Sequence, residues 1–204
     1  MTAELLRLFP TPVIVDQVEG ADELNRDLET AILEQRERDG GLKLSNRGGW
    51  QSKRDFPRWA GEPGQRVLQH AIKLASANTG FRPERGPPQW NVDVWANVSE
   101  SGGFNMPHIH GGTFWSAVYY VRAGEGEGGQ LVLHDPRMPA LRMHAPALRF
   151  KDMGPDIRTE IEPKSGLMIL FPAWLLHSVE PWEGDGHRIS VAMNIRAVPP
   201  QRRS

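Results

Sequence analysis

QWNVDVWANV, residues 89–98, alternates strictly between two kinds of side chain. Successive residues of an extended strand point to opposite faces of a sheet, so a period of two predicts a strand. One face of this strand carries Trp90 and small aliphatic residues. The other face carries Asn91, Asp93, Trp95 and Asn97. We therefore expect the β-rich part of the chain to begin here.

The sequence after this stretch predicts many more short strands. Glycine-rich and proline-containing turns separate them, such as GEGEGG at 124–129 and PKSG at 163–166. SESGGFN at 99–105 is expected to be a turn of the same kind. The further strands are expected near 106–110, 114–122, 129–134, 146–151, 157–162, 167–171, 177–181 and 188–197. Many strands with regular turns predict an antiparallel sandwich or barrel.

The part before residue 86 is predicted to be mostly helical. A short strand is expected at 10–18, and helices at about 21–38 and 63–78, where apolar residues recur at helical spacing. Residues 42–61 are expected to be an irregular loop. Taken together, the chain is predicted to be mainly β: a double-stranded β-helix, or jelly roll, with N-terminal helices packed on one sheet. We expect one domain over 1–204, with helices and a long loop in 1–85 and the jelly-roll core in 86–200.

Composition excludes several function classes. The 204 residues carry 24 Lys and Arg against 25 Asp and Glu, a net charge of −1, which argues against nucleic acid as the main partner. The absence of cysteine excludes disulfides, iron–sulfur clusters and thiol nucleophiles. The apolar stretch 167–176 is too short to cross a bilayer, and the first residues lack the pattern of a signal peptide. We expect a cytoplasmic protein, either a monomer or a homodimer.

Three of the seven histidines suggest a metal site. His108 and His110 are two residues apart, so both imidazoles point to one face if the segment is extended. His177 follows much later in the chain, directly after FPAWLL. Neutral imidazole binds iron, zinc, copper and nickel well. An H-x-H pair alone is equally consistent with exposed or hydrogen-bonded histidines.

The stretch RISVAMN, residues 188–194, predicts a strand with an unusual polar face. Ile189, Val191 and Met193 form an apolar face. Arg188 and Ser190 share the opposite face, where an arginine can bind a carboxylate through two charge-assisted hydrogen bonds and a serine can add a third. The alternative is a solvent-facing surface of the sheet with an incidental arginine.

These motifs together resemble the Fe(II)/2-oxoglutarate-dependent oxygenases. The stretches NMPHIHGGTFWSAVYYV (105–121), HDPR (134–137), GLMILFPAWLLHSVEP (166–181) and RISVAMN (188–194) are similar to a bacterial subfamily whose substrate is unassigned. LFPTPV (8–13), GGWQS (48–52) and WANV (95–98) fit the same subfamily, so the resemblance spans nearly the whole chain. It implies an enzyme that uses O2 to couple decarboxylation of 2-oxoglutarate to oxidation of a small-molecule or peptide substrate.

The resemblance also implies roles for individual residues. His108 and His177 become iron ligands, with His110 as the third, where most of the superfamily has an aspartate. Arg188 becomes the partner of the distal carboxylate of 2-oxoglutarate, assisted by Ser190. Tyr120 or Tyr119 lines the same pocket, and their opposite faces allow only one of them.

Several residues remain open at this point. Asp135 either compensates for the missing carboxylate, serves as the ligand in place of His110, or only caps the turn before Pro136. Further candidates for contact with the substrate or with the metal ligands are Asn105, Trp95, Trp115 and Asn194, with packing in the core favoured for the two tryptophans. The loop 42–61 is either a lid hinged at Gly48-Gly49 that presents Trp50, Gln51 and Arg54 to substrate, or a solvated connection with Trp50 packed inside.

Two other classes of protein are compatible with the same residues. A cupin-type dioxygenase or isomerase would use three histidines without 2-oxoglutarate, and Arg188 would then bind substrate. A non-catalytic metal- or ligand-binding jelly roll would bind metal without turnover. Production of succinate separates the first class from an oxygenase.

Overall fold

A computed structural model describes residues 4, 6, 8–42, 44, 46–138 and 157–198 of the chain. The strand expected at 146–151 lies outside these residues. The elements are β1 (Ile14–Gln17), α1 (Ala21–Arg38), β2 (Asn46–Gln51), α2 (Phe56–Trp59), α3 (Gly61–Ala77), the 3-10 helix η1 (Pro83–Arg85), β3 (Gln89–His108), β4 (Trp115–Arg122), β5 (Glu125–Gly128), β6 (Leu131–His134), β7 (Arg158–Ile161), β8 (Leu167–Pro172), β9 (His177–Asp185) and β10 (Arg188–Val198).

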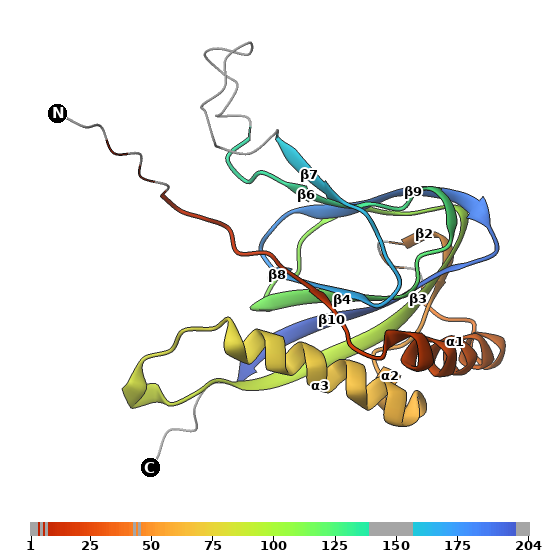
Figure 1. Cartoon of the computed structure of the whole chain (residues 1–204), viewed down its shortest axis with the longest axis horizontal. Coiled ribbons are helices and arrows are strands. Elements are labelled where there is room, and N and C mark those ends of the chain that lie inside the picture. The colour runs from red at the N-terminus through yellow and green to blue at the C-terminus, as the bar shows by residue number, and fades with distance from the viewer. Residues whose placement is uncertain are drawn as a thin grey trace, which may run out of the picture.

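The strands form one curled antiparallel sheet in the order β1-β8-β4-β10-β3-β9-β6-β7, with β2 added to β3 and β5 added to β9. Figure 1 shows the sheet folding over on itself, with α1, α2 and α3 covering one outer face beneath β3, β4 and β10. This arrangement confirms the predicted mainly-β jelly roll with N-terminal helices on one sheet. Strands β1 and β2, from the first 85 residues, are part of the same sheet as the later strands.

β3 connects the two layers of the curl. Its first half, from Gln89 to Ser99, pairs with β10, and its end, from Gly103 to His108, pairs with β9. The prediction of a turn at 99–105 was wrong, because the strand bends here without ending. Gly102 adopts a φ of 78°, and a Cβ at Gly103 would come within 2.4 Å of the Gly48 carbonyl oxygen. Glycine therefore allows the bend and the close approach of β2.

The segment 42–61 is more regular than predicted. Asn46–Gln51 forms β2, and Phe56–Trp59 forms the short helix α2. β2 has no β-branched residue, and it exists because it pairs with β3 through a register shift between Arg47 and Gly49. A Cβ at Gly49 would lie 2.5 Å from the Val98 carbonyl oxygen, so only glycine permits this pairing. Trp50 is buried, and its indole N–H donates to the Asp39 carbonyl.

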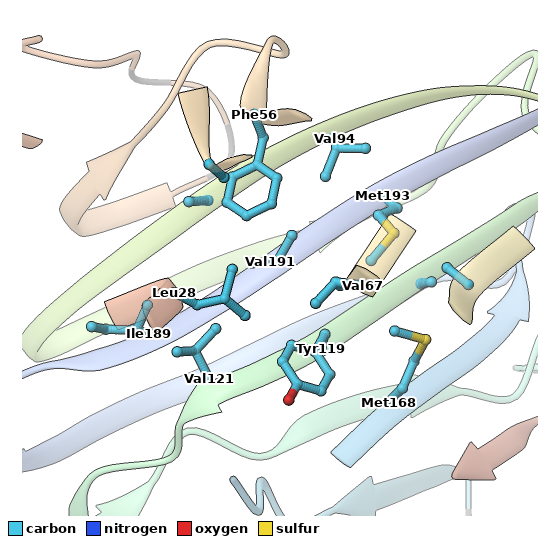
Figure 2. Packing of buried hydrophobic residues seen from close by; sticks show 14 of the residues in the cluster. Leu28, Phe56, Val67, Val94, Tyr119, Val121, Met168, Ile189, Val191 and Met193 are labelled. Atoms are coloured by element: carbon cyan, nitrogen blue, oxygen red, sulfur yellow. The ribbon is translucent and has the colours of Figure 1, made fainter. Parts of the chain in front are cut away.

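The main core lies between the helices and the outer face of the sheet. Figure 2 shows Leu28 of α1 and Val67 of α3 beside Val191 of β10 and Tyr119 of β4. Leu28 and Val191 are fully buried, and each such side chain contributes about 1.5–3 kcal/mol. The Tyr119 hydroxyl donates to the Asn25 Oδ1 atom at 2.7 Å. The outer face of these strands therefore packs against the helices in the core. The side chains on the inner face of the sheet are not needed for this packing.

A second apolar cluster lies inside the curl and includes Tyr120, Leu131, Ile169 and Phe171. No helix among the described residues is long and apolar enough to cross a membrane.

Candidate functional site

The inner face of β10 and its two neighbours carries side chains in rows across the sheet. Register partners in antiparallel strands point to the same face, and successive rows lie about 7 Å apart. Counted from Arg188, the rows are Tyr120–Ser190–Asn97 (the first row), Val118–Ala192–Trp95 (the second row) and Ser116–Asn194–Asp93 (the third row). All of these except Asn194 and Asp93 line one pocket, together with Arg188 and the three histidines.

The three predicted histidines meet at this pocket. His108 of β3 and His177 of β9 are register partners, and His110 follows directly after β3. Their ring centroids are 4.3, 4.9 and 5.0 Å apart, and one ligating nitrogen from each lies within 4.8 Å of the others. The backbone N–H of His110 donates to the Ala173 carbonyl at 3.0 Å. This bond holds the segment after β3 beside the β8–β9 connection.

Backbone carbonyls fix two of the imidazoles in one tautomer. The Nδ1 atom of His108 lies 2.7 Å from the Met106 carbonyl oxygen, and that of His177 lies 2.8 Å from the Leu175 carbonyl oxygen. A carbonyl only accepts, so the proton is on Nδ1 and the lone pair on Nε2. Both rings therefore present Nε2 as a donor atom for a metal.

Burial lowers the pKa of two of the three imidazoles, those of His110 and His177. It lowers the pKa of His177 to about 3, with a smaller contribution from the adjacent His108. Burial also lowers the pKa of His110 to about 4, with smaller contributions from His108 and Arg54. A neutral imidazole is the form that coordinates a metal ion.

Arg188 is a buried cation that has no counter-ion among the described residues. Arg188 is 3% exposed, and its Nη2 atom donates to the Gly129 carbonyl at 3.0 Å. Its Nε atom has no partner, and no described carboxylate forms an ion pair with it. Burial lowers the pKa of Arg188, although a guanidinium remains protonated in proteins. An unpaired buried charge costs several kcal/mol, so this arrangement points to an anionic ligand.

The residues around Arg188 complete a polar end of the pocket. The guanidinium lies 5.1 Å from the centroid of the Tyr120 ring. The Tyr120 hydroxyl is buried without a partner, and burial raises the pKa of this phenol. Ser190 is buried beside it in the first row. Tyr119 points to the opposite face, so of the two tyrosines only Tyr120 lines the pocket.

The other predicted residues divide into two groups. Asn105 and Trp95 line the pocket, and Asn194 is buried in the third row. Trp115 is not brought to the site: it packs in the core on the helix side, where its indole N–H donates to the Thr79 hydroxyl at 2.8 Å. The alternation along β4 explains this, because Trp115 and Tyr119 share a face that Tyr120 does not.

Asp135 also lies apart from the histidines. Its carboxylate accepts hydrogen bonds from the backbone N–H and the guanidinium of Arg137. Among the described residues, one group could hold a metal ion. It consists of the three histidines and does not include Asp135. The part of the chain that the structure describes therefore brings no carboxylate to this group of histidines.

Sequence reasoning missed several pocket residues. Ser116 and Asn97 line the pocket, and Gln51 of β2 lines it with its side chain 3% exposed. The alternation at 89–98 had already put Asn97 on the polar face. Ser116 could have been found in the same way, since it shares a face of β4 with Tyr120. Gln51 was expected only as a residue that a lid over 42–61 would present to substrate, because β2 itself was not predicted.

The fold and this site define a class: a jelly-roll protein with three clustered imidazoles that could hold a metal ion and a buried arginine in the same pocket. Residues 93–194 match the family model described as "Putative 2OG-Fe(II) oxygenase". The match covers half of the chain, and the protein therefore belongs to this family of 2-oxoglutarate- and Fe(II)-dependent oxygenases. Comparison with curated proteins gives no match.

Solved structures of low sequence identity share the fold. A viral collagen prolyl hydroxylase from Paramecium Bursaria Chlorella virus-1, in complex with 2-oxoglutarate, is 18% identical with a TM-score of 0.61, covering 90% of this chain and 96% of that one. A prolyl-4-hydroxylase from Pseudomonas putida is 19% identical with a TM-score of 0.63, covering 91% and 92%. HygX from Streptomyces hygroscopicus, with nickel and 2-oxoglutarate bound, is 14% identical with a TM-score of 0.61, covering 94% and 84%.

Proposed function

We propose that His108, His110 and His177 hold the Fe(II) of this oxygenase and that Arg188 binds the distal carboxylate of 2-oxoglutarate. The observation that carries the proposal is the buried guanidinium of Arg188, which has no counter-ion among the described residues, in the same pocket as the three imidazoles. A carboxylate supplies both the charge and the acceptors that Arg188 lacks.

The donor set fits the metal. Imidazole nitrogen is a good ligand for Fe(II), and three such ligands leave coordination positions open. When bound, Fe(II) and 2-oxoglutarate supply the activation of O2 that oxidises the substrate and releases succinate and CO2. The usual ligand set in such enzymes has one carboxylate. Here the third position is the neutral His110, so the protein contributes no negative charge to the metal.

The chain's own groups position the cosubstrate. Arg188 and Ser190 offer hydrogen bonds to the distal carboxylate, and the Tyr120 hydroxyl lies on the same inner face as a further donor. The Met106 and Leu175 carbonyls orient the two ligand histidines. The apolar walls from Leu131 and Phe171 exclude water from the space between them.

Anaerobic titration of the metal-free protein with Fe(II) and 2-oxoglutarate tests this proposal. We expect the weak visible charge-transfer band of a chelated keto acid in the wild type, and its loss or weakening in Arg188→Ala. Arg196→Ala is the matched control, because Arg196 already forms an ion pair with Asp93 at 2.9 Å. Fe(II) binding without any band would overturn the role of Arg188 and favour a three-histidine cupin-type enzyme, in which this arginine binds substrate.

A further inference from the structure

Two buried polar side chains in the third row are not explained by the metal or by 2-oxoglutarate. Ser116 of β4 and Asn194 of β10 are register partners, so they lie side by side on the inner face. They are 2% and 5% exposed, and Ser116 Oγ and Asn194 Oδ1 have no hydrogen-bond partner. A buried polar atom without a partner costs about 1–3 kcal/mol, which is unfavourable unless a ligand satisfies it.

The position of the pair excludes 2-oxoglutarate as that ligand. Asn194 is six residues along β10 from Arg188, which is about 20 Å in an extended strand. A five-carbon diacid anchored at Arg188 does not span this distance. Ser116 is also the register partner of Phe171, whose ring lies 4.8 Å from that of the predicted ligand His177. Ser116 lines the end of the pocket that lies beyond the metal-binding group as seen from Arg188, and Asn194 is buried beside Ser116 in the same row.

The charges around the pair indicate what it binds. Asp93, in the same row, is paired with both guanidinium nitrogens of Arg196 at 2.9 Å and with Arg54 at 3.1 Å. No carboxylate lines the pocket among the described residues, and its one cation, Arg188, is assigned to 2-oxoglutarate. The unsatisfied atoms are an amide oxygen, which accepts, and a hydroxyl, which donates and accepts.

We infer that Ser116 and Asn194 form the substrate-recognition end of the pocket and bind an uncharged group that donates a hydrogen bond, an alcohol O–H or an amide N–H. This inference rests on the proposed function, because it takes the second ligand of the pocket to be the substrate. The part of the substrate that binds beside the metal therefore carries no charge and bears a hydroxyl or an amide group.

The first arm of the test needs no substrate and uses metal-free protein. Ser116→Ala and Asn194→Leu remove unsatisfied atoms, so the melting temperature should stay the same or rise. Ser178→Ala and Asn25→Leu are matched controls, because Ser178 bonds to His134 at 3.1 Å and Asn25 accepts from Tyr119 at 2.7 Å. Losing these bonds should lower the melting temperature by about 2–4 °C or more. Losses in the Ser116 and Asn194 variants equal to those of the controls would overturn the inference.

The second arm measures recognition in full-length protein loaded with Zn(II) and 2-oxoglutarate. Saturation-transfer NMR compares cyclohexanol with methoxycyclohexane, and propanamide with N,N-dimethylpropanamide. The wild type should bind the donor of each pair, and both variants should lose this preference with a roughly tenfold weaker affinity. Equal binding within each pair, a preference kept by both variants, or no binding of any probe would overturn the inference. The affinity for 2-oxoglutarate should not change in either variant, and failure of the wild type to bind it would instead overturn the proposed function.

Discussion

Replacing Arg188 with methionine should make the metal-free protein more stable and abolish its response to 2-oxoglutarate. The substitution removes a buried charge that lacks a counter-ion, and its apolar side chain retains much of the packing. Replacing buried charges with apolar groups often stabilises a protein by about 1–4 kcal/mol. The Gly129 carbonyl loses its donor at 3.0 Å, which costs about 1–3 kcal/mol. The midpoints of the two ranges leave a small net gain of about 0.5 kcal/mol.

The assay is thermal unfolding with and without 2-oxoglutarate. For a domain of this size, a gain of about 0.5 kcal/mol raises the melting temperature by roughly 1–2 °C. With Zn(II) present and 2-oxoglutarate at 100 times its dissociation constant, the wild type should gain a further 2.7 kcal/mol or so, and the variant nothing. The order of the two melting temperatures should therefore reverse when the cosubstrate is added.

Arg196→Met is the control for this prediction. Arg196 makes a two-pronged ion pair with Asp93, so its loss should lower stability slightly and leave the response to 2-oxoglutarate intact. The reasoning is refuted if Arg188→Met melts below the wild type without ligand and still shifts upward with 2-oxoglutarate. That result would mean that Arg188 is a structural residue and that the cosubstrate is anchored elsewhere.

Three further predictions concern the same pocket. His110→Ala should weaken Fe(II) binding by at least about a hundredfold, measured in competition with a chromophoric chelator. His110→Asp supplies a carboxylate ligand and should retain Fe(II) binding. Equal affinity of both variants and the wild type would contradict ligation by His110. The folded-state pKa values of His177, about 3, and His110, about 4, lie below the ordinary 6.5, so the unfolded chain takes up protons first as the pH falls. The stability of the metal-free protein to urea should be greatest above pH 6.5 and decline between pH 6.5 and 4.5, by up to about 1.4 kcal/mol per pH unit for each histidine. The stability of His177→Gln should decline less steeply. An identical slope would contradict the lowered pKa of His177. Gly129→Ala should weaken 2-oxoglutarate binding, because its Cβ would lie 3.1 Å from Arg188 Nε. Gly86→Ala is the control: it has a similar φ but nothing within 4 Å of its Cβ, so it should lose only stability. Equal 2-oxoglutarate affinities of the two variants in a titration would count against the role of Arg188.

Local patterns were sufficient for much of the fold. The apolar spacing at 21–38 gave α1 with the bounds that the structure has. The alternation at 89–98 and at 188–194 correctly separated the faces of β3 and β10. These predictions succeed because the periodicity of a helix or strand is written in consecutive residues.

Features that depend on distant partners could not be predicted in the same way. β2 is polar and glycine-rich, and it is a strand because β3 offers it a free edge. The sequence also does not show that Ser116 and Asn194 are neighbours, since this depends on the register between β4 and β10. The three histidines could be grouped from the family pattern, but the absence of a partner for Arg188 is visible only once its surroundings are known.

The distribution of unsatisfied atoms separates the two faces of the same strands. Five buried side-chain polar atoms of the described residues lack a partner, and four of them belong to Ser116, Tyr120, Arg188 and Asn194, all on the inner face of β4 and β10. The outer face has no such cost, since Tyr119 bonds to Asn25 and its neighbours are apolar. At about 1–3 kcal/mol each, four orphans are comparable to the net stability of a domain. Violations this concentrated are expected at binding sites. Arg188 and Asn194 are about 20 Å apart along β10, so one small diacid cannot form hydrogen bonds with both. The unsatisfied side chains of this inner face therefore require a second ligand.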